Sequence, residues 1–436
     1  MKRRVVSTTS PNPELADDGR TAVTSTGMQS PVATKRLLPS IAILSVFVFA
    51  TYGAVLGILL PAQIATINPD PVAKVANFGL VSSISFVFTL FAQPIVGAFS
   101  DRTRNRLGRR APWMLIGAAV AMIFLLGMGG MQNVLLIAAF WAVIQVSMNA
   151  VQGPLSAVVP DRFPRSKRGV ASAMAGVGMM LGGVLGTVVA AQFVSNVGIG
   201  YAVFGIAVLI VTALYVYFNK DYSSVGAVVE PWSWKNFLTG FWINPKKHPD
   251  FFWAFTARFL FILGYFVISA YSLYLLQDYI GMELEEAAGA AAMLAMAGLL
   301  PTMISIALAG WWSDKIGRRK VFIYAATVIM VISLIFPLIM PTFEGMLIMN
   351  IVSGFGFGFY MACDAALMTE VLPGDGIAAG KDLGILNVAT NIPQALSPAV
   401  AGFIIIALGG YPSLFIFAMV AVTAAAFVLM PIKSVR

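Results

Sequence analysis

Long apolar stretches, separated by short polar segments, follow one another along this chain of 436 residues. Three charge-free stretches, at 111–160, 169–219 and 383–432, are too long for one membrane helix, which needs about 20 apolar residues. Each contains a Gly-rich turn signal near its middle, so each predicts a pair of helices. Six single stretches lie at 39–61, 77–99, 251–276, 287–311, 321–342 and 345–369. The hydrophobic pattern therefore predicts twelve transmembrane helices.

Composition supports a membrane protein and excludes several soluble classes. Charged residues make up 11% of the chain, against about 25% in a typical soluble protein, and the mean hydropathy is +0.85. These values exclude a disordered chain, a nucleic-acid-binding domain and an ordinary soluble enzyme. We therefore expect an all-α integral membrane protein that is surrounded by the lipid bilayer and has no nucleic-acid partner.

Residue types that bind metals or carry out catalysis are scarce. The chain has one cysteine, Cys363, and one histidine, His248, which excludes an internal disulfide, a cysteine-ligated metal and a histidine-pair metal site. His248 lies in a polar run, and the chain has neither a dinucleotide-binding nor a P-loop fingerprint. The sequence therefore predicts no catalytic residues, no cofactor, no metal site and no enzymatic activity.

The basic residues are distributed unevenly across the predicted membrane. With both termini placed in the cytoplasm, all of the 28 Lys and Arg residues lie on the cytoplasmic side except Lys74, outside, and Arg258, inside a helix. Basic loops are typical of the cytoplasmic side. The formal net charge of +9 is thus a topology signal. It predicts a multi-pass protein of the plasma (inner) membrane with both termini in the cytoplasm.

Polar segments divide the chain into five regions. They are a Ser-, Thr- and Pro-rich cytoplasmic tail at 1–37, a six-helix bundle at 38–218, a cytoplasmic linker at 219–250, a second six-helix bundle at 251–432 and a short tail at 433–436. The composition of the first tail predicts disorder.

The linker carries an amphipathic pattern. After Pro231, large apolar residues recur at helical spacing, namely Trp234, Phe237, Leu238, Phe241 and Trp242. This pattern favours a short helix that lies in the membrane interface. The alternative is an aromatic-rich linker that packs on the ends of the membrane helices.

The two bundles repeat one loop motif at corresponding positions. After the second helix the motif consists of Gly97, Asp101, Gly108, Arg109 and Arg110, and after the eighth helix it consists of Gly310, Asp314, Gly317, Arg318 and Arg319. An acidic residue also ends the fourth and tenth helices, Asp161 and Glu370, with matching neighbours. Two such pairs in corresponding loops indicate an internal repeat.

This loop motif resembles the signature of the major facilitator superfamily, and the resemblance covers roughly residues 38–432. It implies two pseudo-symmetric six-helix bundles around a central cavity, lined by the first, fourth, seventh and tenth helices. It also implies transport by rocking between states that open to opposite sides of the membrane.

Three further segments are similar to the sucrose/proton symporters and the related glycoside–cation symporters. They are the expanded loop at 101–112, the end of the fourth helix at 149–161 and the start of the eleventh helix at 383–394. Plant sucrose carriers typically have Arg two residues after the proline equivalent to Pro154, whereas this chain has Ser156. The resemblance therefore implies a sugar-like substrate and leaves sucrose itself open.

The repeated loops are candidates for a gate. A carboxylate at Asp101 or Asp314 can accept hydrogen bonds from a helix N-terminus and pair with the neighbouring Arg residues. Such contacts would form when the cytoplasmic side closes, and Gly97 and Gly310 would let two helices approach closely there. We predict a gate latch, which the acidic residues at the ends of the fourth and tenth helices would join. The alternative is a set of permanent capping contacts.

Polar side chains inside a span are costly and usually mark a transport path. Two helices carry amides at i, i+4 and i+7 on one face: Gln145, Asn149 and Gln152 on the fourth helix, and Asn387, Asn391 and Gln394 on the eleventh. Amides both donate and accept hydrogen bonds, which suits a hydroxyl-rich substrate; the alternative is hydrogen bonding between helices. Tyr52 and Tyr360 are candidate stacking surfaces, with ordinary packing as the alternative.

Arg258 and Asp364 are the two charges inside the predicted spans. At the rise of an α-helix they lie about 10 Å and about 9 Å from the cytoplasmic side, on two helices expected to line the cavity. We predict an ion pair in which Asp364 binds the coupling proton and Arg258 controls its affinity. The alternative is a static pair that holds the bundle together.

Small residues mark two helices. The fifth helix carries Gly178, Gly182 and Gly186 on one face, and the eighth is Ala-rich between Ala287 and Gly298. If these helices face each other across the bundles, as in the resembling family, we expect the small residues to permit sliding. The fifth helix lacks the Gly-Pro pair of many drug/proton antiporters, which lowers the weight of an export function.

Three classes of function follow from these patterns. The first is a monomeric, proton-coupled importer of a small-molecule sugar or glycoside, with sodium as the alternative coupling ion; the loops and the amides favour it. The second is a proton-coupled exporter of a drug or metabolite, with Met and Phe side chains lining an adaptable pocket. The third, a receptor or scaffold that transports nothing, is disfavoured by the two intact gate motifs.

Overall fold

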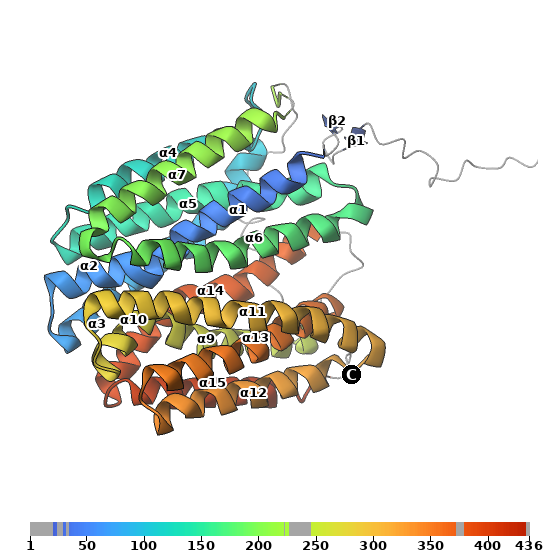
Figure 1. Cartoon of the computed structure of the whole chain (residues 1–436). Coiled ribbons are helices and arrows are strands. Elements are labelled where there is room, and N and C mark those ends of the chain that lie inside the picture. The colour runs from blue at the N-terminus through green and yellow to red at the C-terminus, as the bar shows by residue number, and fades with distance from the viewer. Residues whose placement is uncertain are drawn as a thin grey trace, which may run out of the picture.

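Twelve apolar helical segments lie side by side in the computed structural model of this chain, which describes residues 21–23, 29–31, 35–221, 223–225, 246–371 and 379–432 (Figure 1). The first is α1 (Leu37–Ala54) continued by the π-helical turn η2 (Val55–Leu59) and α2 (Leu60–Ile67). It is followed by α3 (Pro71–Arg102), α4 (Ala111–Met128), α5 (Val134–Arg162), α6 (Arg165–Ala191), and α7 (Val197–Phe218), which is preceded by the 3-10 turn η3 (Val194–Asn196).

The second set has the same number of segments. It begins with α9 (Pro249–Ala270), continued by α10 (Ser272–Tyr274) and the π-helical turn η4 (Leu275–Tyr279). It continues with α11 (Leu284–Ile316), α12 (Arg319–Ile339), α13 (Phe343–Val371), α14 (Ala379–Ala407) and α15 (Pro412–Val428). Among the described residues, eleven segments are long and apolar enough to cross a membrane, and α15 is shorter at 17 residues. The prediction of an all-α membrane fold is confirmed.

Most helices run past the apolar stretches that predicted them. The stretch at 77–99, for example, lies inside α3, which extends over 32 residues. The length of an apolar stretch is set by the thickness of the hydrocarbon layer, whereas a helix continues beyond that layer until a capping residue or a turn ends it. At the start of α3 that residue is Asp70, whose carboxylate accepts a hydrogen bond from the backbone N–H of Ala73.

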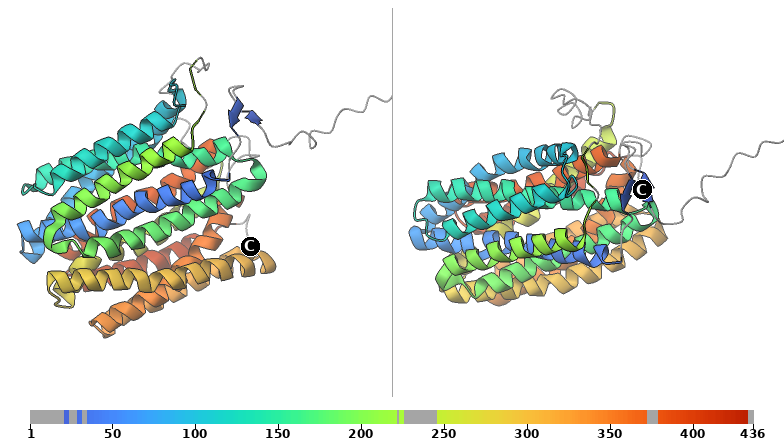
Figure 2. Two further views of the ribbon diagram at one scale, coloured as in Figure 1. Left: turned by 45° about the horizontal axis from the view of Figure 1, so that its top comes forward. Right: turned by 90° about the horizontal axis from the view of Figure 1, so that it is seen from above.

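The helices form two layers that correspond to the two halves of the sequence. The blue-to-green half, α1 to α7, lies above the yellow-to-red half, α9 to α15, in Figure 1, and the left view of Figure 2 shows the same division. The halves pack through α3 against α14 and through α6 against α11. The fifth and eighth membrane helices therefore do meet across the bundles.

The glycine face of α6, however, does not lie in that contact. A Cβ added at Gly178, Gly182 or Gly186 would overlap backbone carbonyl oxygens of α1 in the same half, at Ala42, Val46 and Ala50. These glycines therefore serve the close packing of two helices within one bundle. The expectation that they permit sliding between the halves is wrong, because the spacing of small residues defines a face but not the helix that packs on it.

The two ends of the bundle differ in charge. We call the end that carries the Arg-rich loops after α3 and α11 the basic end, and the opposite end, which carries Lys74, the far end. Gly317 ends α11 at the basic end with φ +66°, a left-handed conformation that glycine adopts without steric cost.

Three expectations concern the polar segments. Within the first tail the structure describes a short antiparallel pair, β1 (Thr21–Val23) and β2 (Gln29–Pro31), where disorder was expected. The amphipathic segment of the linker, 234–242, lies outside the described residues, and so does the final tail at 433–436.

Candidate substrate and ion-coupling site

The two intramembrane charges meet. The Nη1 atom of Arg258, on α9, lies 3.3 Å from Oδ2 of Asp364, on α13, and both side chains are at most 9% exposed. The hydroxyl of Tyr360, one turn before Asp364 on the same helix, donates a hydrogen bond to the other carboxylate oxygen at 3.1 Å. The sequence-predicted residues Arg258, Asp364 and Tyr360 thus form one buried cluster, which we call the ion-pair site.

The ion-pair site is incompletely satisfied. Arg258 Nε is buried without a hydrogen-bond partner among the described residues, and the buried Asp364 Oδ2 has only the 3.3 Å contact with Arg258 Nη1. Separating one partner from such a pair leaves an uncompensated charge in a low-dielectric region, which is expensive. A proton on the carboxylate would remove that cost, so this arrangement is chemically able to link protonation of Asp364 to the position of Arg258.

Stacked aromatic rings continue from the ion-pair site along α9 and α13. The ring of Tyr360 lies parallel to that of Phe261, with centroids 3.5 Å apart. One turn further, the rings of Tyr265 and Phe357 stack with centroids 4.1 Å apart. These pairs fix the two helices against each other between the ion-pair site and the next polar feature.

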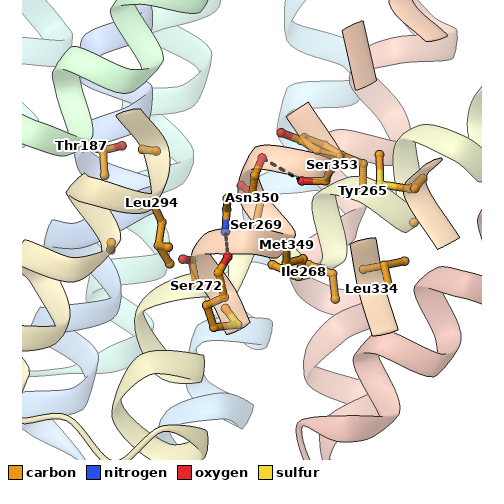
Figure 3. Close-up of a pocket in the computed structure, with 16 residues that line it drawn as sticks. Thr187, Tyr265, Ile268, Ser269, Ser272, Leu294, Leu334, Met349, Asn350 and Ser353 are labelled. Atoms are coloured by element: carbon orange, nitrogen blue, oxygen red, sulfur yellow. Dashed lines mark hydrogen bonds between the residues drawn. The ribbon is translucent and has the colours of Figure 1, made fainter. Parts of the chain in front are cut away.

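That feature is a pocket of about 120 Å³ toward the far end, which we call the polar pocket (Figure 3). Besides Tyr265, its polar lining residues are Ser269 on α9, Ser272 on α10, Asn350 and Ser353 on α13, and Thr187 on α6 of the other half. The hydroxyl of Ser353 donates to the backbone carbonyl of Asn350 at 3.3 Å, and the Asn350 amide donates to the carbonyl of Met346 at 2.9 Å.

The ion-pair site and the polar pocket lie on the same two helices. Arg258 and Ser269 are eleven residues apart on α9, and so are Asp364 and Ser353 on α13, which corresponds to about 16 Å of helix in each case. The two features therefore belong to one helix pair, although they do not touch each other.

The predicted amide faces lie elsewhere. Gln145 and Asn149 are buried on α5, Gln152 is half-buried, and the Asn149 amide donates to the backbone carbonyl of Gln145 at 2.8 Å. The helix α5 contributes no residue to the polar pocket. Asn391 and Gln394 are half-buried on α14, and the side chain of Asn387 lies outside the described residues. Tyr52 is half-buried and lies near Phe49, with ring centroids 6.0 Å apart.

Sequence reasoning missed the residues of the polar pocket. Ser269 and Ser272 are spaced i, i+3, and so are Asn350 and Ser353, in the seventh and tenth membrane segments. This pairing in two helices expected to line the cavity was the available signal. It is weak, because Ser and Thr are common in membrane helices and often hydrogen-bond to their own backbone.

The gate motif of the first half forms a charge network at the basic end. Arg110 lies 2.6 Å from Asp101 and 3.1 Å from Asp161, and Arg109 lies 2.8 Å from the same Asp161. Gly108 adopts φ +90° in the loop, and a Cβ there would collide with Asp221. The network confirms that these residues lie together, and it joins parts of one half.

The second half repeats the network in a shorter form. Arg319 Nε lies 2.9 Å from Glu370, while Arg318 is exposed and the side chain of Asp314 lies outside the described residues. A Cβ added at Gly97 or Gly310 would meet no described atom within 4 Å. No helix that the structure describes therefore makes the close approach expected at these glycines, and the role of the motif as a gate stays a prediction.

The far end, in contrast, is closed by contacts between the halves. The hydroxyls of Tyr271 and Tyr274 donate to the backbone carbonyls of Val75 and Pro61 at 3.1 and 2.9 Å. The Ser195 hydroxyl donates to Glu285 at 2.7 Å. An ion pair between Lys74 and Asp278 adds a charged contact at 2.6 Å.

Comparison with known families shows similarity along nearly the whole chain. A family model described as Major Facilitator Superfamily matches residues 41–303 and 288–435. The sucrose transport protein SUC3 of Arabidopsis thaliana is 31% identical over 120 residues, which cover 22% of this chain and 20% of that protein. An uncharacterized symporter of Synechocystis, sll1374, is 54% identical over 39 residues, which cover 9% of this chain and 7% of that protein. The matches thus span a fifth or less of these relatives.

Solved structures show the same fold at low sequence identity. A bacterial homolog of the human lysosomal transporter Spinster, in an inward-facing and unoccupied conformation, superimposes with a TM-score of 0.67 at 13% identity, covering 91% of this chain and 95% of that chain. The nucleoside transporter NupG superimposes with a TM-score of 0.66 at 15% identity, covering 91% and 98%. These likenesses establish the two-bundle transporter architecture.

Proposed function

We propose a specific transport activity for this chain, which belongs to the Major Facilitator Superfamily and is a multi-pass membrane transporter. It is a monomeric symporter that works by alternating access and imports a neutral sugar or glycoside together with a proton. The observation that carries the proposal is the buried contact between Arg258 and Asp364, with Tyr360 on the second carboxylate oxygen. Ionisable groups inside a span are costly and mark ion or substrate pathways.

The geometry of the ion-pair site favours a proton over sodium as the coupling ion. A guanidinium nitrogen already lies 3.3 Å from the Asp364 carboxylate, so a second cation at this place would be repelled by the first. A proton instead neutralises Asp364 by a covalent O–H bond and releases Arg258. Coupling then consists in alternating the partner of the carboxylate, Arg258 in one state and the proton in the other.

The lining of the polar pocket favours a neutral, hydroxyl-bearing substrate. Its polar side chains carry hydroxyls and one amide, and none of its described lining residues is Asp, Glu, Lys or Arg. Hydroxyls and amides donate and accept hydrogen bonds without demanding a charged ligand. The partial similarity to a sucrose transport protein supports the same substrate class.

Charge distribution supports an orientation in the plasma membrane. The basic end would face the cytoplasm, with both termini on that side, because basic loops are retained there during insertion. In this orientation the conformation described above is closed toward the outside.

The proton role of Asp364 can be tested in proteoliposomes with an imposed pH gradient. We expect Asp364→Asn to abolish sugar accumulation driven by the gradient, because an amide cannot cycle between a proton and Arg258, while exchange of labelled for unlabelled sugar continues. Glu344→Gln is the matched control, since Glu344 is an exposed acid on the same helix, α13. Gradient-driven accumulation by Asp364→Asn at the wild-type rate would refute the coupling role.

The substrate class needs a separate experiment. Purified protein in proteoliposomes is screened against radiolabelled mono- and disaccharides, with and without a proton gradient. Uptake that depends on the gradient is the expected result. Absence of sugar uptake, together with drug sensitivity of cells that lack the protein, would favour the exporter instead.

A further inference from the structure

The far end contains a buried charge cluster that joins the two halves. Lys74 lies near the start of α3 in the first half, and Asp278 lies in the π-helical turn η4 of the second half. Their Nζ and Oδ1 atoms are 2.6 Å apart, and the side chains are only 5% and 15% exposed. Among the residues that the structure describes, Lys74 is the one Lys or Arg at this end of the bundle.

Two tyrosines of the second half complete the cluster. The hydroxyl of Tyr411, just before α15, donates a hydrogen bond to the other carboxylate oxygen of Asp278. Burial, reinforced by this bond, raises the pKa of the Tyr411 hydroxyl, so it remains a donor at physiological pH. The Nζ atom of Lys74 lies 5.0 Å from the centroid of the Tyr274 ring, within cation–π range. Asp278 is therefore held by its own half and reaches Lys74 of the other half.

Backbone geometry at the same place supports a moving part. The first membrane segment of each half contains a π-helical turn toward the far end, η2 and η4. Such turns are rare in proteins, and those that occur are often found at functional sites. The two meet at the closure: Tyr274, next to η4, donates its hydroxyl hydrogen bond to the carbonyl of Pro61, next to η2.

From this arrangement we infer that Lys74, Asp278 and Tyr411 form the gate that keeps the far end closed. When the halves rock apart at this end, the Lys74–Asp278 pair has to separate and both charges become hydrated. The pair therefore sets the balance between the state closed at the far end and the state open there. This far-end gate differs from the repeated Arg-rich motif at the basic end. Its ion pair joins the two halves, whereas the ion pairs described for that motif lie within one half.

The gate can be measured by labelling, without any substrate. In a background carrying Cys363→Ala, Ser269→Cys places a thiol in the polar pocket, and a membrane-impermeant maleimide is added to intact cells. We expect slow labelling with the gate intact and labelling about tenfold faster with Lys74→Met or Asp278→Asn, as for a loss of about 1.4 kcal/mol from the closed state. Tyr411→Phe removes one hydrogen bond and should give a smaller increase, which keeps the test valid if a charge variant fails to fold.

Three controls make the result decisive. Gln132→Cys, in the exposed loop before α5, must label rapidly to show that the far end faces the reagent. Glu285→Gln removes the charge from the exposed acceptor that binds Ser195 at the same end and weakens this contact, and it should leave the Ser269→Cys rate unchanged. The double variant Lys74→Met/Asp278→Asn should label no faster than the faster single variant, because one pair is lost in each case.

Unchanged labelling in all three gate variants, with Gln132→Cys reactive, would overturn the inference. So would an equal acceleration by Glu285→Gln, since any loosened contact would then act alike. Neither outcome depends on the sugar or on the proton, so the far-end gate and the proposed symport can fail separately.

Discussion

At the scale of single residues, Arg258 and Asp364 show how charge is accommodated inside a membrane helix bundle. They are buried together, and Tyr360 supplies one hydrogen bond to the carboxylate. The buried Nε of Arg258 nevertheless has no hydrogen-bond partner among the described residues. A buried ion pair is seldom more stabilising than apolar residues of similar volume. Stability alone therefore does not explain this cluster, and the unsatisfied nitrogen makes that explanation weaker still.

The mutual dependence of the two charges predicts a stability pattern. Arg258→Met should lower the free energy of unfolding by about 3–5 kcal/mol, because Asp364 is left as an unpaired buried charge. The double variant Arg258→Met/Asp364→Leu should recover most of this loss while remaining uncoupled. Thermal unfolding of the purified protein in detergent measures both effects. A double variant no more stable than Arg258→Met would show that the charges do not depend on each other.

At the scale of elements, the close contact of α6 with α1 makes glycine necessary on one face only. Gly182→Ala places a Cβ against the Val46 carbonyl oxygen, whereas the adjacent Gly183→Ala meets no described atom within 4 Å. We expect Gly182→Ala to destabilise the protein by about 1–3 kcal/mol, as overpacking does. Gly183→Ala should be neutral or stabilising, since alanine is the better helix former. The two Tm values in detergent decide this, and equal values would contradict the packing described.

The same elements show what sequence patterns determine. Apolar length predicted the membrane helices, because the hydrocarbon layer imposes it on every span. The partner of a helix face is not encoded in its spacing, so the glycines of α6 were assigned to the wrong neighbour. The i, i+3 spacing of Ser269 and Ser272 was too weak a pattern to predict the polar pocket. Arg258 and Asp364 were a strong indication of a site, because a charged residue inside a span is costly.

At the scale of the whole molecule, the contacts between the halves are asymmetric. Hydrogen bonds and an ion pair join them at the far end, whereas the ion pairs that the structure describes around Asp161 and Glu370 at the basic end lie within single halves. In an alternating-access cycle the opposite state must reverse this arrangement. The space beside Gly97 and Gly310 is where we expect the halves to meet in that state.

A larger side chain in the space beside Gly97 should therefore hinder only the state in which the basic end is closed. Gly97→Leu should leave the Tm of the present conformation unchanged or slightly higher, because leucine is the better helix former. Transport should fall several-fold, and outside labelling of Ser269→Cys should slow, since closure of the basic end is hindered. Gly176→Leu, at an exposed helical glycine that also has open space, serves as control. Normal transport by Gly97→Leu would exclude close approach at this glycine.

The π-helical turns η2 and η4 have a consequence for the numbering of helix faces. Backbone hydrogen bonds in a π-turn span five residues, where those of an α-helix span four, so side chains beyond the π-turn are rotated relative to those before it. The face of α9 that carries Arg258, Phe261, Tyr265 and Ser269 therefore does not continue to Asp278 by counting in steps of three and four. A helical wheel drawn through the whole segment would assign Asp278 to a wrong azimuth. The two stretches on either side of η4 have to be projected separately, and the same holds for the first membrane segment around η2.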